Sequence, residues 1–170
     1  MKTKTIATLG LFLALGLILP YILSHSYGIP GTILLPMHLP LLIISFLYGP
    51  KIGLLFGIVL PITSFIFTSM PSVYFLPIMV VELSTYGVFC GLFYYKYKLN
   101  IYLSLLLGLI IGKINYALML YLLINITKIP QFVNIPSITA AIYVGMPGII
   151  LQFFLVPLVV VLFKKFNYDK

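Results

Sequence analysis

Residues 101–126 read IYLSLLLGLIIGKINYALMLYLLINI, an apolar run that contains a single charged side chain, that of Lys113. A bilayer core about 30 Å thick needs about 20 apolar residues in one helix, so this run is long enough to cross it. The whole chain of 170 residues has the same character, with 62% hydrophobic and only 7% charged residues. Soluble domains are about a quarter charged. The sequence therefore predicts an all-α integral membrane protein in which residues 1–170 form a single transmembrane domain.

Proline, glycine and lysine divide the chain into six apolar segments. They predict six transmembrane helices, at Thr5–Leu23, Leu35–Tyr48, Ile52–Thr68, Val73–Tyr95, Ile101–Ile126 and Ser137–Phe163. The second helix is the shortest, and Pro36 and Pro40 lie near its start. The segment Gly49–Gly53 predicts a tight turn, and a longer polar loop precedes the sixth helix.

The lysines test this topology independently, because all ten positive charges are lysines. With six spans, eight of them fall on one side of the membrane: Lys2, Lys4, Lys51, Lys96, Lys98, Lys164, Lys165 and Lys170. Lys128 alone falls on the other side, and Lys113 lies within a span. Positive loops stay in the cytoplasm, so both the N- and the C-terminus are expected there. Topology and attraction to anionic lipid explain the net charge of +8, so no nucleic acid is expected as a partner.

Glu82 and Lys113 are charged residues inside consecutive antiparallel spans. At about 1.5 Å per residue they lie about 13 Å and about 19 Å from the outer ends of their helices, so their side chains are able to meet. A charge at such depth costs several kcal/mol unless it is paired or reaches water. Two interpretations follow: the residues line a polar pocket open to the outside, or they form a structural ion pair that locks two helices.

Several other polar residues are placed to join such a pocket. Tyr86 lies one turn from Glu82 on the same helix face. The remaining candidates for ligand contact are Tyr116, Asn115, His38 and Gln152, and Tyr74, Met70 and Asn134 are candidates for the outer loops that cap the pocket.

Small residues mark the faces where helices approach each other closely in lipid. Gly53 and Gly57 are four residues apart, as are Gly87 and Gly91, and most such glycines are expected to serve internal packing. Another small-residue face, on the first helix, comprises Ala7, Gly10 and Ala14. This face fits either internal packing or docking of a partner protein.

The missing motifs argue against an enzyme. The sequence contains no nucleotide-binding loop, so the chain is not expected to hydrolyse ATP. One buried acid cannot form an acidic magnesium site. Two distant histidines and a single cysteine do not suggest a metal site either, and no cofactor is expected.

The whole chain resembles the substrate-binding S components of energy-coupling factor (ECF) vitamin transporters. The resemblance rests on the length, the topology and four segments in order: LPMHLP at 35–40, YGPKIG at 48–53, TSMP at 68–71 and ELSTYG at 82–87. These segments are similar to those of the pantothenate and cobalamin-precursor groups. The first helix departs from the family's pattern of alanines four apart, because this spacing is occupied by Gly10 and Ala14.

The resemblance implies a multi-pass protein of a bacterial cell membrane that binds a small vitamin-like molecule from outside. Its partners would be a transmembrane coupling protein and two ATPase subunits, with the face of the first helix as the docking surface. Two alternatives remain from the residues alone: a self-sufficient small secondary transporter or channel, and a structural membrane subunit without a ligand.

Overall fold

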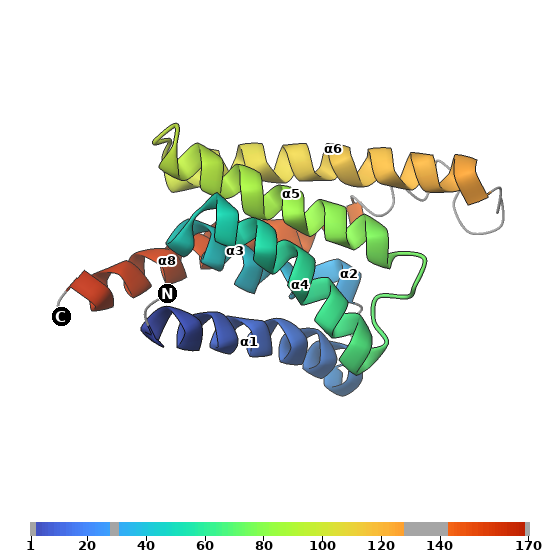
Figure 1. Ribbon diagram of the computed structural model, residues 1–170, viewed down its shortest axis with the longest axis horizontal. Coiled ribbons are helices and arrows are strands. Elements are labelled where there is room, and N and C mark those ends of the chain that lie inside the picture. Colours follow the sequence, from blue (N-terminus) through green and yellow to red (C-terminus); the bar gives the residue numbers. More distant parts are fainter. Residues whose placement is uncertain (1–2, 28–30, 128–142, 169–170) are drawn as a thin grey trace.

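The computed structural model describes residues 3–27, 31–127 and 143–168, and every regular element in these ranges is a helix (Figure 1). The helices are α1 (Thr3–Tyr27), α2 (Gly31–Leu34), α3 (His38–Tyr48), α4 (Pro50–Thr68), α5 (Leu76–Tyr95), α6 (Ile101–Thr127) and α8 (Met146–Tyr168). The prediction of an all-α fold is therefore confirmed for the described part of the chain.

Five of the described helices, α1, α4, α5, α6 and α8, are long and apolar enough to cross a membrane. Large apolar side chains on their outer surfaces are exposed, among them Phe67, Phe154 and Phe166, as expected for contact with lipid. The chain is therefore a multi-pass membrane protein. By contrast, α3 has 11 residues, a length of about 16 Å, which is less than the thickness of a bilayer core. A sixth complete span stays a prediction.

The segment before α3 differs from the predicted helix Leu35–Tyr48. Residues 31–34, which the sequence suggested to be loop, form the short helix α2, and α3 begins only at His38. Between them, Leu35 has a left-handed φ of 48°, which breaks the helical conformation. Pro40 falls in the first turn of α3, where a helical N–H has no intrahelical partner and its loss is tolerated.

The connection between α3 and α4 is shorter than predicted. Gly49 alone joins the two helices, whereas the sequence suggested a turn over Gly49–Gly53. Gly49 adopts a φ of 88°, which glycine tolerates because it has no Cβ. Pro50 then starts α4, at a position where its missing N–H costs nothing. The predicted turn is wrong in length, because residues 51–53 already belong to the helix.

The boundaries of two further helices differ from the predicted ones. The helix predicted from Val73 begins at Leu76, with Pro77 in its first turn. The last described helix begins at Met146 and continues to Tyr168, beyond the predicted end at Phe163. Ser137, its predicted start, lies outside the described residues.

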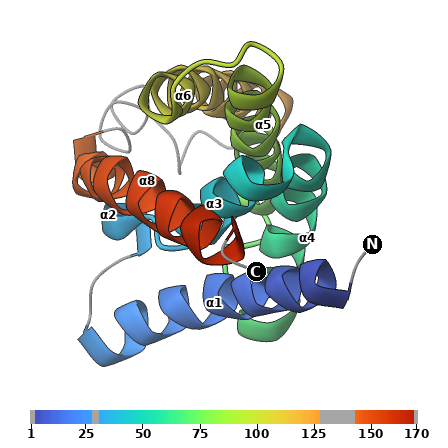
Figure 2. The ribbon, with the colours of Figure 1, turned by 90° about the vertical axis from the view of Figure 1, so that its left-hand side faces the viewer.

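The short helix α3 occupies the centre of the bundle. In the end-on view of Figure 2 it is surrounded by α1, α4, α5 and α8, all of which it contacts, while α6 lies outside α5. Its buried residues are His38, Pro40, Leu41, Leu42, Ile43, Ile44, Ser45 and Phe46. A helix that is apolar on all sides is expected in such a position.

The closest helix contact joins α4 to α5 and confirms that the spaced glycines serve internal packing. A Cβ added to Gly53 would overlap the backbone of Gly87, and the reverse also holds. One turn away, a Cβ on Gly57 would lie 2.6 Å from the backbone of Ser84. Small residues at these positions let the two backbones touch, which supplies packing energy that lipid cannot replace.

Hydrogen bonds from side chains fix α3 against α5. The Ser45 hydroxyl donates to the Gly87 carbonyl at 2.6 Å. The Tyr95 hydroxyl lies 3.0 Å from the carbonyl oxygen of Phe46 and 2.8 Å from that of Leu47, so it donates to the C-terminal end of α3. The last carbonyls of a helix have no intrahelical partner, and such groups are costly in a membrane protein's interior. Tyr95 therefore provides a donor for the last carbonyls of α3, where this helix meets α4.

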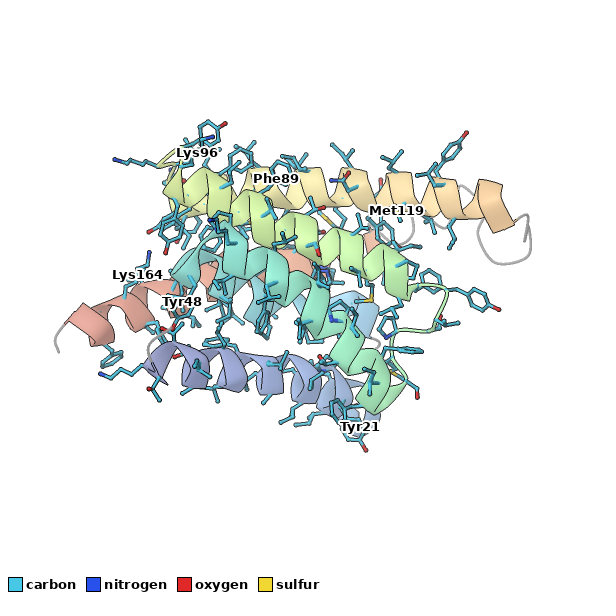
Figure 3. All side chains as sticks on the ribbon, in the orientation of Figure 1. Tyr21, Tyr48, Phe89, Lys96, Met119 and Lys164 are labelled. Carbon is cyan, nitrogen blue, oxygen red and sulfur yellow. The ribbon has the colours of Figure 1, made fainter. Side chains whose placement is uncertain are left out.

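The first residue of α1 and the last residue of α8 lie at the same end of the bundle. The beginning of α1 and the end of α8 lie at the left of Figure 1, as do the connections from α3 to α4 and from α5 to α6. Lys96 and Lys164 lie at this end in Figure 3, and Tyr21 lies at the opposite end. We call the former the lysine-rich end. The predicted topology, with six spans and this end in the cytoplasm, stays a prediction.

Replacing Gly87 with alanine is expected to lower the free energy of unfolding by about 1–3 kcal/mol, because the new methyl group overlaps the backbone of Gly53. Thermal unfolding of the purified protein in detergent measures the effect. Gly10→Ala is the matched control, since nothing lies within 4 Å of its added Cβ, and it should leave stability unchanged or slightly higher. Equal melting temperatures for Gly87→Ala and wild type would contradict the close contact.

Candidate functional site

The centre of the candidate site is the carboxylate of Glu82 on α5, which is only 3% exposed. Its Oε1 atom accepts hydrogen bonds from the Lys113 ammonium at 2.7 Å and from the Tyr86 hydroxyl at 2.7 Å. The sequence-based expectation that Glu82 and Lys113 meet is therefore confirmed. Tyr86 lies one turn along α5 and Lys113 lies on the neighbouring α6, so two helices supply this part of the site.

His38 brings α3 into the same group. Its Nε2 atom lies 3.9 Å from Glu82 Oε1, which is too long for a hydrogen bond. Its ring lies beside that of Tyr86, with centroids 5.4 Å apart. His38 is 3% exposed, and neither ring nitrogen has a hydrogen-bond partner in the described part of the chain. Because the helical conformation is broken at Leu35, His38 is the first residue of α3, and its side chain lies in the core.

Lys113 has a second neighbour and partial access to the surface. Its ammonium lies 5.1 Å from the ring centroid of Tyr116, within the range of a cation–π contact. The Lys113 side chain is 18% exposed, whereas that of Glu82 is 3% exposed. The pair therefore has one buried member and one member that reaches the surface of the described structure.

Asn115 on α6 reaches Thr85 on α5, with 3.4 Å between Asn115 Nδ2 and Thr85 Oγ1. Sequence reasoning missed Thr85, although its position three residues after Glu82 places it on a nearby helix face. The Thr85 hydroxyl also donates to the Val81 carbonyl of its own helix. The contact links α5 and α6 beside the charged pair.

Gln152 on α8 is fully buried, and neither its amide nitrogen nor its amide oxygen has a hydrogen-bond partner among residues 3–27, 31–127 and 143–168. Among the described residues, the side chains of Ser84 and His38 also have buried polar atoms without a hydrogen-bond partner. Buried polar groups in proteins are nearly always hydrogen-bonded, so each exception calls for an explanation. The sequence indicated Gln152 as mid-span and polar, but it could not show that the amide lacks a partner.

Two of the residues predicted to cap the outer end, Met70 and Tyr74, are not part of this buried group. Met70 and Tyr74 lie between α4 and α5 and are 48% and 63% exposed. The Met70 carbonyl accepts a hydrogen bond from the Ser64 hydroxyl at 2.8 Å, which ties this segment to α4. Asn134 lies outside the described residues. A role for these three residues in ligand binding stays a prediction.

The small-residue face of the first helix points outward. Ala7, Gly10 and Ala14 are all exposed on α1, and no atom lies within 4 Å of a Cβ built on Gly10. The opposite side of α1 packs inward through Phe12 and through Gly16, where an added Cβ would lie 2.6 Å from the Leu60 side chain. The internal-packing interpretation of Ala7, Gly10 and Ala14 is therefore not supported by the described contacts.

A comparison with protein families matches residues 4–163 to the family described as ECF transporter, substrate-specific component. The chain belongs to this family. No curated protein and no solved structure matches it. As an ECF substrate-specific component, the chain is a membrane transport subunit and not an enzyme. Such components bind small substrates and work with an ECF module. The narrower similarity to the pantothenate and cobalamin-precursor groups stays a prediction.

Removing Lys113 is expected to destabilise the protein more than removing Glu82. Lys113→Met leaves a buried carboxylate without a counter-charge and should cost about 3–5 kcal/mol of unfolding free energy. Glu82→Gln should cost less, because the remaining ammonium reaches the surface. The double variant Glu82→Gln/Lys113→Met should recover most of the loss. Thermal unfolding of all three variants measures this, and simple additivity of the two single effects would contradict a coupled pair.

Proposed function

We propose that this chain is the subunit of an ECF importer that binds a small water-soluble vitamin, or a vitamin precursor, from outside the cell. It would pass the molecule inward through a transmembrane coupling protein driven by two ATPase subunits. The family match supports the general role. The position of the ligand within the bundle is inferred from the buried polar residues.

The observation that carries this site is the presence of two buried polar side chains for which no partner is found among the described residues: His38, beside Glu82, and Gln152 on α8. A structural ion pair accounts for Glu82 and Lys113, since each satisfies the other. It does not account for His38 or Gln152, whose side-chain polar atoms have no partner in the part of the chain that the structure describes. Ionisable residues inside a membrane protein are costly and indicate function by default. A ligand that supplies the missing hydrogen bonds explains both features.

The proposed side of entry follows from the direction of the helices. Glu82 is the seventh residue of α5 and so lies about 9 Å along the helix from its first residue. This start lies at the end of the bundle opposite the lysine-rich end (Figure 1). If the lysine-rich end faces the cytoplasm of a bacterial cell, as positive-inside topology predicts, the Glu82 group is closer to the outer surface.

The proposed docking surface for the coupling protein is the face formed by Ala7, Gly10 and Ala14. Small residues let a partner helix approach the backbone closely, and this approach is the main source of helix association in lipid. The face is exposed along α1, and α1 contacts α2, α3 and α4 through its other side. Docking would therefore leave the Glu82 group intact.

Ligand binding is tested with purified protein against a panel of water-soluble vitamins, by thermal shift and by native mass spectrometry. Wild type should bind one of them, and Glu82→Gln/Lys113→Met should bind it at least about tenfold more weakly, equivalent to about 1.4 kcal/mol. Lys164→Ala is the matched control, because Lys164 contacts Tyr94 at 2.8 Å at the lysine-rich end. If wild type binds no vitamin, the proposal fails. If the double variant binds as tightly as wild type, the pair is structural only.

Docking is tested by replacing Gly10 with tryptophan, which should prevent a partner helix from approaching α1. We expect Gly10→Trp to abolish co-purification with the coupling protein and ATPase subunits, while vitamin binding is unchanged. The control is Leu118→Trp on α6, where the native side chain is 52% exposed. Co-purification of Gly10→Trp at the wild-type level would show that this face of α1 is not the docking surface.

A further inference from the structure

We propose that the transported molecule carries a neutral amide-type group, such as a carboxamide, an amide or a ureido group, and that His38 and Gln152 bind this group. The inference rests on the proposed function and names the class of substrate that the site accepts. It depends on the position of Gln152, on the missing hydrogen-bond partners of its amide, and on the charge balance around Glu82.

The position of Gln152 follows from a close backbone contact one turn away. A Cβ on Gly148 would lie 2.7 Å from both the carbonyl carbon and the carbonyl oxygen of Leu34. Gln152 lies four residues after Gly148 on the same face of α8, and His38 starts α3 after the short non-helical segment 35–37 that follows Leu34. Both α3 and α8 run from the opposite end towards the lysine-rich end (Figure 1), and they contact each other. The turn that carries Gln152 therefore lies alongside the start of α3.

The hydrogen-bonding capacity of the two side chains is complementary to an amide. The Gln152 amide offers two N–H donors and a carbonyl acceptor, and a neutral histidine offers one donor and one acceptor. None of these side-chain atoms has a partner in the described structure, although both side chains are at least nine-tenths buried. An amide-type ligand group also has a donor and an acceptor in one plane. It can satisfy a donor on one residue and an acceptor on the other.

The charge balance explains why this group is neutral. Glu82 Oε1 already accepts hydrogen bonds from the Lys113 ammonium and from Tyr86, so the formal charges of the pair cancel. A charged ligand group at Gln152 would be desolvated without a counter-charge close by, which is strongly unfavourable. An acidic part of the same ligand is better placed near Lys113, which is 18% exposed and has donors to spare.

The experiment compares Gln152→Met, which keeps the size of the side chain, with Ser45→Ala as the matched control. Ser45 is another buried polar residue, but its hydroxyl already donates to Gly87. The probes are pantothenate, biotin, riboflavin and nicotinamide, which carry an amide, ureido, imide or carboxamide group, and thiamine, pyridoxine and nicotinate, which carry none.

We expect wild type to bind a probe of the first group, and Gln152→Met to raise its Kd about tenfold or more through the lost hydrogen bonds. Without ligand, Gln152→Met should melt at the wild-type temperature or higher, because an amide without a partner is removed. Ser45→Ala should melt lower than wild type, and its Kd should rise less than that of Gln152→Met.

Three outcomes would overturn the inference in distinguishable ways. Binding only of thiamine, pyridoxine or nicotinate would exclude an amide-type substrate and leave the proposed function intact. An unchanged Kd together with a lower melting temperature in Gln152→Met would show that Gln152 holds a structural water molecule. Failure of wild type to bind any probe would contradict the proposed function and, with it, the inference that rests on it.

Discussion

The contact between Gly53 and Gly87 is the constraint on which the rest of the bundle depends. It brings the backbones of α4 and α5 together at a point where neither residue leaves room for a side chain. The Gly87 carbonyl at this point also accepts the hydrogen bond from Ser45, so α3 is held to the same place. Tyr86 precedes Gly87 directly, and Glu82 lies about one turn before it. The geometry of the candidate site is thus set by packing immediately beside it.

The same arrangement reconciles a stable bundle with an interior that contains charge. The pair of Glu82 and Lys113 joins α5 to α6, and its desolvation is offset by its short distance and by the Tyr86 hydroxyl. His38 and Gln152 add polar atoms that no described group satisfies. In the function proposed above, a ligand would supply the partners of these groups, so that they are satisfied only in the bound state.

Much of the site was visible in the sequence because charged residues are rare in it. With two acids in the chain, the depth of Glu82 and Lys113 in adjacent helices was sufficient to pair them. The residues that surround the pair could be predicted less well from the sequence. Thr85 looked like an ordinary helix residue, and the exposed positions of Met70 and Tyr74 depend on how the segment before α5 folds. The partnerless state of Gln152 depends on which side chains surround it in three dimensions.

Composition and apolar run length by themselves determined that the chain is an all-helical, multi-pass membrane protein, because the cost of placing backbone and charge in lipid applies to any arrangement of the helices. The lysine positions likewise predicted which helix ends lie together. Only the tertiary structure decided that the second apolar segment is a short helix in the centre of the bundle. Its C-terminal end is fixed by Tyr95, which is distant in sequence, and by Gly49, whose backbone angle local propensity does not specify. The burial of His38 beside Glu82 follows from that placement, because a side chain's neighbours are fixed by packing between helices and not by its own segment.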